Sequence, residues 1–401
     1  MMKRLLWTIT GIGLLSLVGA QPDVELQVVA LVMARHPHAR ALRLELESVH
    51  RLERSARLPL APTVFLAPEL SAGGVGEQFL LNQPLELNGA RQARARIARA
   101  EYALVRAHAE LELNELLAAA LAAYHEYAYR AQIAAVAQEA MQLAEQTHEK
   151  IRLQVEAGAR AGIDLMQADI ERERVRQHAA LRQAEATVAL ERLRAALGGV
   201  SPDELATADT RAAPTPSLSP DTSPAVRIEQ ARLQMAQAQA QQIRVEGLPD
   251  LGVQVRIERF RDARTRPAFG LSLTLPFLDY GARQQQLRAQ QQRAEAQQQR
   301  LLAARVRYEG ERAAAQRRYE NARARAEAYQ QRILPQALQL AQATQTGLEV
   351  GQISILQLLE AQRTARQVRE EALLAAMELK LAEVELRRLR GEFAPYLEVI
   401  Q

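Results

Sequence analysis

Cysteine is absent from the 401 residues, and aromatic residues make up only 4% of them. Without thiols the chain cannot form disulfides, thiolate metal sites or a lipid-anchored N-terminal cysteine, and it cannot use a cysteine nucleophile. The scarcity of aromatic residues disfavours a large compact core and favours helices that pack through small residues. No run of 18 or more apolar residues occurs, so the sequence predicts no membrane-spanning helix.

Lysine is nearly absent as well, since only Lys3, Lys150 and Lys380 accompany the many arginines. The formal net charge is +4, and arginine alternates with glutamate in stretches such as residues 171–174. This interleaving is typical of solvated, ion-paired helix faces. Because neither a nucleic-acid-binding motif nor a catalytic motif is present, we expect no nucleic-acid partner, no enzymatic activity, no metal site and no cofactor.

Residues 1–20 have the pattern of a signal peptide. Lys3 and Arg4 precede an apolar stretch that ends in the small residues Gly19 and Ala20. Cleavage before Gln21 is the expected processing, and the mature protein would then lie beyond the inner membrane. A buried N-terminal helix is the alternative interpretation.

The sequence contains an internal repeat. When Gly158 is aligned with Gly351, an offset of 193 residues, the two copies agree without a gap as far as Gly198 and Gly391. Matches at fixed spacing over such a length indicate duplicated structural units. Upstream, the segment from Pro84 to Gly89 corresponds to the segment from Pro276 to Gly281, where each copy is expected to turn from a strand into a helix. These four residues therefore mark the predicted strand–helix corners.

Each copy is predicted to contain a helix, two strands and two long helices. The first repeat covers residues 21–198, with strands at about 63–71 and 77–87 and long helices at 90–157 and 163–197. A proline-rich linker, residues 199–223, separates it from the second repeat, residues 224–401. That repeat has predicted strands at about 250–260 and 267–278 and long helices at 282–350 and 353–390.

The long helices form the largest part of each repeat. Residues 90–157 contain neither proline nor glycine, and at 1.5 Å per residue such a helix would extend about 100 Å. Pro335 should kink the corresponding helix of the second repeat or start a new one. The apolar residues that follow, such as Leu356 and Leu359, form narrow stripes, which suit helical coiled-coil hairpins better than a thick core.

The strands differ from the rest of the chain because their apolar residues recur every second position. Leu251, Val253, Val255 and Ile257 alternate with small or polar residues, and residues 269–275 repeat the pattern. Strands of about ten residues match a tilted membrane-spanning strand. Four strands cannot close a barrel, and open sheet edges do not persist in lipid, so several copies of the chain would be needed. A soluble pair of β-hairpins packed on helices is the alternative.

Several segments resemble the outer-membrane efflux channels typified by TolC, a family of outer membrane factors. Residues 333–337 and 351–363 are similar to the repeat signature of that family, and residues 83–89 and 275–281 are similar to its proline-to-glycine corner. Residues 30–62 resemble its first helix, so the similarity covers nearly the whole mature chain.

The resemblance implies a mainly α fold with membrane β, in which two tandem repeats each supply a β-hairpin and a long coiled-coil hairpin. Three copies would form a 12-stranded β-barrel in outer-membrane lipid and an α-barrel in the periplasm. Such a homotrimer would conduct substrates passively, as part of a tripartite efflux or type I secretion system with a periplasmic adaptor and an inner-membrane pump. A periplasmic coiled-coil adaptor, or a structural protein without a pore, is the alternative.

The resemblance also assigns roles to individual residues. The hairpin tips, at Gly158, Gly351 and Gly347, would contact the adaptor. Asp164, Glu360 and Gln357 would line the periplasmic aperture, where the trimer would repeat each carboxylate three times and attract cations. The alternative is that Asp164 and Glu360 are simply exposed helix residues.

Overall fold

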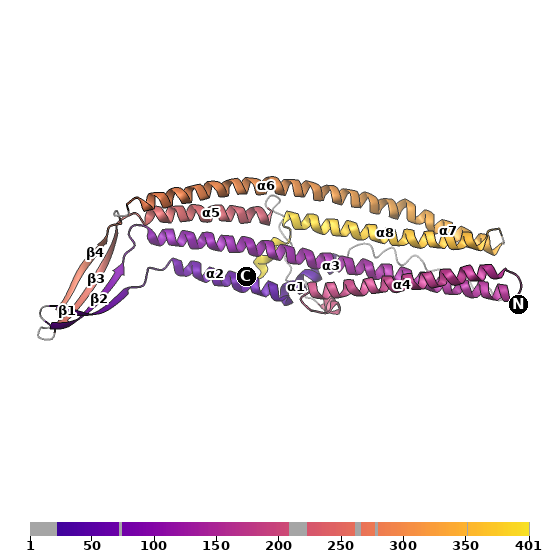
Figure 1. Cartoon of the computed structure of the whole chain (residues 1–401), viewed down its shortest axis with the longest axis horizontal. Helices are drawn as coiled ribbons and strands as arrows, with labels where there is room; N and C mark the ends of the chain where they lie inside the picture. The colour runs from indigo at the N-terminus through magenta and orange to yellow at the C-terminus, as the bar shows by residue number, and fades with distance from the viewer. Residues whose placement is uncertain are drawn as a thin grey trace. The chain divides into compact units, whose positions relative to one another are not determined.

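A computed structural model describes residues 22–71, 74–207, 223–260, 266–276, 280–350 and 352–400. These residues form mainly helices, together with four strands in one sheet (Figure 1). The predicted fold class, mainly α with a β-hairpin and long helices in each of two tandem repeats, is confirmed. The predicted signal peptide and most of the linker lie outside the described residues.

The first repeat begins with two short helices in place of one. Its elements are α1 (Pro22–Arg35), α2 (Pro37–Ala56), β1 (Thr63–Ser71), β2 (Gly74–Pro84), α3 (Ala90–Glu156) and α4 (Gly162–Ala196), followed by a 3-10 turn at Pro202–Thr207. Strand β2 starts and ends three residues before the predicted range of 77–87. It ends early because Glu86 has a φ of 52° and so leaves the extended conformation.

The second repeat has the same order of elements. They are α5 (Pro224–Val245), β3 (Asp250–Phe260), β4 (Arg266–Thr274), α6 (Ala282–Ala328), a π turn (Tyr329–Ile333), α7 (Leu334–Glu349), α8 (Ile355–Arg390), a 3-10 turn (Ala394–Tyr396) and α9 (Leu397–Ile400). Strand β4 stops four residues before the predicted end at 278, and Thr274 pairs with Asp250, the first residue of β3.

Pro335 interrupts the third long helix, as the sequence predicts. The π turn at Tyr329–Ile333 precedes it, and Pro335 lies in the first turn of α7. Proline cannot donate a backbone hydrogen bond, and its ring clashes with the preceding turn of an α-helix. The wider π turn accommodates the ring, so the predicted helix 282–350 consists of α6 and α7 with a π turn between them.

The sheet joins the two repeats through antiparallel pairing of β2 with β3, in the order β1-β2-β3-β4. Leu81 pairs with Val255, and Val255 pairs with Phe269, so apolar residues of neighbouring strands share one face. On this face Phe269 is 80% exposed and Leu271 is 76% exposed. The apolar face is therefore not the buried core of a single chain, which argues against the soluble-hairpin alternative.

The chain forms two compact units that cut across the sequence repeats. Unit 1 takes the described residues within 1–40, 114–217 and 312–400, and unit 2 takes those within 41–113 and 218–311. Helices α3 and α6 contribute residues to both units. Each unit therefore contains segments of both repeats, and the duplication seen in the sequence is not a division into two separately packed halves.

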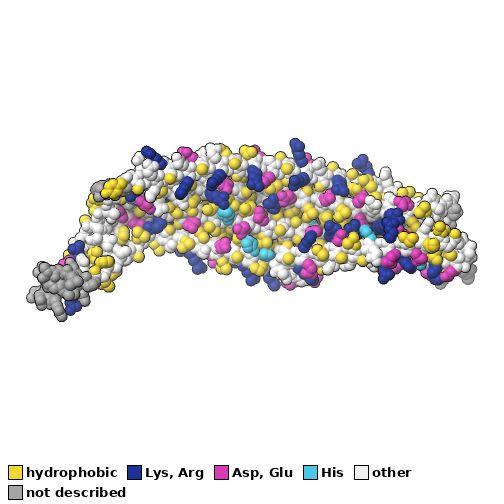
Figure 2. Space-filling view, viewed as in Figure 1, with side chains coloured by type: hydrophobic (Ala, Val, Ile, Leu, Met, Phe, Trp, Pro, Cys, Tyr) yellow, Lys and Arg dark blue, Asp and Glu magenta, His cyan; other side chains and the backbone are white. Residues whose placement is uncertain are grey.

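Small and aliphatic side chains form the cores of both units. In unit 1, Leu117, Leu121 and Leu193 are fully buried. In unit 2, Ala107 of α3 packs against Ile228 and Ala231 of α5. Charged side chains of both signs are interspersed over the helical surface (Figure 2). Among the described residues, no helix combines the length and the apolar character needed to cross a membrane.

In unit 1, an ion pair between Glu25 of α1 and Arg387 holds the C-terminal end of α8. Glu25 of α1 lies 2.7 Å from Arg387 and 3.2 Å from the ring of His125. These two partners outweigh the opposing effect of burial and lower the pKa of Glu25 to about 2. Glu25 is therefore ionised at neutral pH and connects α1 to α3 and α8.

Asn114 of α3 fixes the C-terminal segment of unit 1. Its side-chain amide donates a hydrogen bond of 2.8 Å to the carbonyl of Arg388 and accepts one of 3.2 Å from the N–H of Phe393. Asn114 and Phe393 are each 1% exposed. The amide thus provides the partner of the buried Phe393 N–H and a second donor for the Arg388 carbonyl, which also accepts from the N–H of Gly391 at 3.0 Å.

We predict that Asn114→Ala lowers the free energy of unfolding by about 2 kcal/mol, because the buried N–H of Phe393 loses its partner and the carbonyl of Arg388 loses one of its two donors. Thermal or denaturant unfolding of the purified protein measures the change. Asn321→Ala is the matched control, since Asn321 is an exposed residue of α6. Equal stabilities of the two variants would contradict this role of Asn114.

Candidate functional site

The first hairpin turn, between α3 and α4 in unit 1, is a glycine-terminated helix end. The N–H of Gly158 donates to the carbonyl of Val155 at 2.9 Å, and the N–H of Ala159 donates to Gln154 at 2.9 Å. Gly158 has a φ of 73°. This pair of bonds with a left-handed glycine is the Schellman motif, which ends helices and turns the chain.

The second hairpin turn, between α7 and α8 in unit 1, repeats one of these bonds. The N–H of Gln352 donates to the carbonyl of Gly347 at 2.9 Å, and both residues are displaced by 193 positions from Ala159 and Gln154. A Cβ atom at Gly347 would lie 3.4 Å from the side chain of Ile353, so Ile353 lies over this glycine. Gly351 itself is outside the described residues, and its proposed contact with an adaptor stays a prediction, as does that of Gly158 and Gly347.

The helix that follows the second turn begins with a capping box. Ser354 accepts a hydrogen bond from the N–H of Gln357, and the Gln357 side chain accepts one of 2.9 Å from the N–H of Ser354. The side chain of Gln357, which was predicted to line the aperture, is thus engaged in starting α8. Its contribution to a pore is untested.

Each of the two predicted aperture carboxylates has an arginine partner in its own chain. Asp164, in the first turn of α4, lies 3.7 Å from Arg160. Glu360 of α8 lies 3.2 Å from Arg363 and is 64% exposed. The negative charge of Asp164 also suits the positive end of the helix dipole. Both carboxylates belong to unit 1 and lie near the N-terminal end of the helix that follows a hairpin turn.

Arg363 also contacts a buried carboxylate. It donates a hydrogen bond of 2.8 Å to Glu171 of α4, whose side chain is only 10% exposed. Arg366 of α8 and Arg174 of α4 each lie 3.8 Å from the same carboxylate. The hairpin of the first repeat is thus joined to that of the second through the Glu171 carboxylate and the guanidinium groups of Arg363 and Arg366.

A second buried carboxylate connects the same two helices, with the carboxylate on α8 and the arginine on α4. Glu370 of α8 is 5% exposed and accepts hydrogen bonds of 3.1 and 3.0 Å from Arg182 of α4. Close to the turns, Ile151, Ala168, Ile355 and Leu359 form an apolar cluster that contains residues of α3, α4 and α8. Apolar contacts and buried ion pairs together set the relative position of the two hairpins within unit 1.

The two strand–helix corners of unit 2 share a left-handed glycine directly before the long helix. Gly89 and Gly281 have φ values of 88° and 84°, and each precedes the first residue of a long helix. Glu86 and Tyr280 also adopt positive φ, at 52° and 51°. Such values are uncommon outside glycine. Glu86 is buried and held by polar contacts, whereas Tyr280 is fully exposed.

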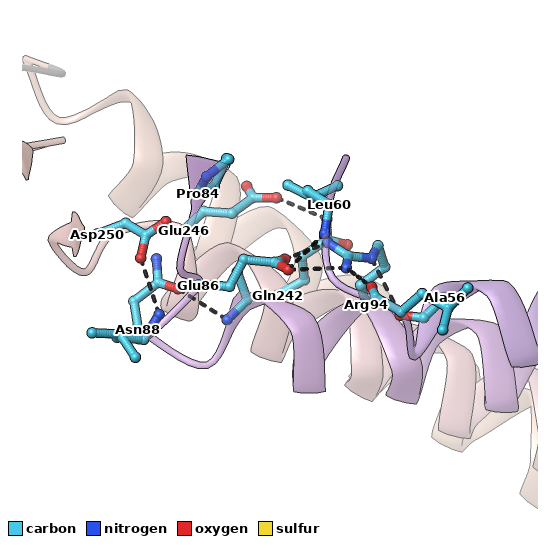
Figure 3. A network of polar contacts seen from close by, with 12 residues as sticks. Ala56, Leu60, Pro84, Glu86, Asn88, Arg94, Gln242, Glu246 and Asp250 are labelled. Carbon is cyan, nitrogen blue, oxygen red and sulfur yellow. Dashed lines mark hydrogen bonds and ion pairs between the residues drawn. The ribbon is translucent and has the colours of Figure 1, made fainter. Parts of the chain in front are cut away.

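The corner after β2 is held by a polar network around Glu86 and Arg94 (Figure 3). Arg94 binds the Glu86 carboxylate at 2.5 Å and also donates to the carbonyls of Leu58 and Ala56. The N–H of Leu60 donates to Glu86 at 3.2 Å. Burial opposes ionisation of Glu86, but Arg94 and the Leu60 N–H outweigh it and hold the pKa below the usual 4.5.

Asp250 extends this network to the first residue of β3. Its carboxylate accepts a hydrogen bond of 3.1 Å from the N–H of Leu87, and Asn88 accepts one of 3.0 Å from the N–H of Ala90, the first residue of α3 (Figure 3). The corner therefore fixes the direction in which α3 leaves the sheet. Pro84 and Gly89 bound this segment, as predicted from the sequence pattern, although their role in function is untested.

Glu86, Arg94 and Glu171 do not stand out in the sequence as functional residues. Glu86 lies between Pro84 and Gly89, in the predicted strand–helix corner, and this position is the one sequence feature that could have indicated its role. Glu171 belongs to an alternating charged stretch that was interpreted as solvated. Its burial arises only because α8 packs over that part of α4, and no local pattern could have shown it.

The chain is similar in sequence to known outer membrane efflux proteins. Residues 216–392 match the outer membrane efflux protein family. Over 308 residues the chain is 28% identical to the cobalt-zinc-cadmium resistance protein CzcC of Cupriavidus metallidurans, covering 72% of this chain and 71% of that protein.

Solved structures share the fold over nearly the whole length. A membrane protein from Pseudomonas aeruginosa superimposes with a TM-score of 0.72 at 19% identity, covering 92% of this chain and 93% of that one. The outer membrane channel MtrE of Neisseria gonorrhoeae, in its open state, gives a TM-score of 0.73 at 19% identity, with 92% and 89% coverage.

We predict that Glu86→Gln lowers the free energy of unfolding by about 2 kcal/mol at neutral pH, because Arg94 loses its charged partner. Since the pKa of Glu86 is lowered in the folded state, its stabilising effect is present above the unfolded-state pKa and is lost as the pH falls through the folded-state pKa. The difference between wild type and variant should therefore shrink in acid. Unfolding experiments across this pH range test it, with Glu45→Gln, an exposed residue of α2, as control.

Proposed function

We propose that the chain is an outer membrane efflux protein and serves as the exit channel of a tripartite efflux or type I secretion system, because residues 216–392 match that family and the chain is 28% identical to CzcC over 308 residues. In this role it would carry substrates passively from the periplasm to the exterior, without catalysis. It would be exported by residues 1–20, lie in the outer membrane and extend into the periplasm.

The exposed apolar face of the four-stranded sheet is the observation that carries this proposal. Phe269, Leu271 and Leu273 lie on that face and are more than half exposed, and large exposed apolar surfaces mark interaction or membrane contact. Four strands leave two open edges, which lipid does not tolerate. Three copies would supply twelve strands and could close a barrel with the apolar face toward lipid.

The partners and cargo follow from the same role. The hairpin turns near Gly158 and Gly347 would meet a periplasmic adaptor, which connects the channel to an inner-membrane pump. The name of CzcC associates that relative with resistance to cobalt, zinc and cadmium, so divalent metal cations are the first cargo to test. Drugs and secreted peptides are the other candidate cargoes.

A periplasmic adaptor or a structural protein without a pore is the competing interpretation. Such a protein has no need for two β-hairpins whose apolar side chains face outward. The pairing of β2 with β3 also uses both repeats to build one continuous sheet. Both features support the channel over the alternative.

We predict that the mature protein is recovered from the outer-membrane fraction and purifies in detergent as a homotrimer. Crosslinking and light scattering in detergent measure the oligomeric state. Recovery as a soluble periplasmic monomer would exclude the channel.

We further predict that Asp164→Ala and Glu360→Ala each reduce the cation preference of the channel, because a threefold set of negative charges is removed from the aperture. Reversal potentials across planar bilayers in a salt gradient measure the preference. Glu191→Ala, an exposed residue near the other end of α4, serves as the control. Unchanged selectivity in both aperture variants would reject the aperture assignment while leaving the channel intact.

A further inference from the structure

We propose that Arg363 is a specificity-determining residue of the channel, because it neutralises the aperture carboxylate Glu360 and so limits the preference for cations. The inference rests on the proposed function. It concerns the sign and size of the charge at the aperture, which the carboxylates alone would make strongly negative.

The geometry allows Arg363 to serve two carboxylates at once. One terminal nitrogen, Nη1, donates to Glu360 at 3.2 Å, and the other, Nη2, donates to Glu171 at 2.8 Å. Glu171 is buried and Glu360 is exposed. Because the guanidinium fork is planar and rigid, the bond to Glu171 holds the other nitrogen toward Glu360. The buried carboxylate of Glu171 thus fixes the position of Arg363, which is the counter-ion of the exposed Glu360.

The surrounding charges leave Arg363 free to compensate Glu360. Glu171 has two further guanidinium groups at 3.8 Å, those of Arg366 and Arg174. The five side chains together carry two negative and three positive charges. Glu171 is therefore compensated without the whole charge of Arg363, and the group that contains Glu360 has a net charge of about +1.

The first repeat has a weaker form of the same arrangement. Arg160 lies 3.7 Å from Asp164, and its Nε donates to Gln154 at 2.6 Å, which holds the guanidinium beside the turn. In a homotrimer each set of three aperture carboxylates would thus be accompanied by three arginines. The aperture would attract cations much less than six uncompensated carboxylates would.

Substituting Arg363 should leave the negative charge of Glu360 uncompensated. Arg363→Gln should raise the permeability ratio of K⁺ over Cl⁻ by about two- to threefold in planar bilayers at low salt, where screening is weak. Glu360→Gln should lower the ratio. The double variant Glu360→Gln/Arg363→Gln should return close to wild type, because both members of the pair are then neutral. Arg369→Gln is the matched control, since Arg369 lies on the same helix but pairs with Glu139 at 3.2 Å.

Arg160→Gln provides a second test that does not touch the buried Glu171. It should raise the same ratio by a smaller amount, because its contact with Asp164 is longer. If Arg363→Gln fails to assemble, Arg160→Gln decides the question. Conducting channels whose selectivity is unchanged or lowered in the arginine variants would overturn the inference, whereas a wild-type protein that forms no channel would overturn the proposed function itself.

Discussion

Buried carboxylates held by arginine determine how the helices of this chain pair. The cores consist largely of alanine and leucine, and such small side chains let neighbouring helices slide with little loss of contact. Glu171 and Glu370 remove that freedom in unit 1, because each lies on one helix and finds its partners on another. A shift of one helix turn would leave a charge buried without a partner, which is far more costly than a rearranged apolar contact. Glu86 has the same role at the corner of unit 2.

The two repeats have kept their backbone more closely than their side chains. Both hairpin turns retain the same hydrogen bond at the same offset, and both corners have a left-handed glycine before a long helix. The side chains that follow the turns differ, with Asp164 after the first and the Ser354–Gln357 capping box after the second. A duplicated hairpin needs the same geometry in both copies, whereas each copy can carry different charges.

The two repeats share backbone geometry but differ in charged side chains, and these charges would influence which ions the proposed channel conducts. In the proposed channel the exposed apolar face of the sheet would contact lipid, and the long helices would form the duct. Glu360 is exposed and is not part of a core, so its charge can change without loss of packing, whereas Arg363 beside it also binds the buried Glu171 and belongs to the architecture. In the proposed channel, substitutions at Glu360 could therefore change the charge at the aperture while the fold is kept.

The sequence by itself determined the order of elements, the duplication, the corners from Pro84 and Pro276, and the apolar face of the strands, because all of these depend on local pattern and spacing. Only the tertiary structure showed that the compact units cut across the repeats, that Glu171 is buried, and that Gln357 caps a helix. It also placed Arg363 between Glu171 and Glu360. Whether a charged residue is solvated or buried depends on what distant segments pack over it, and that information is absent from its neighbours in the chain.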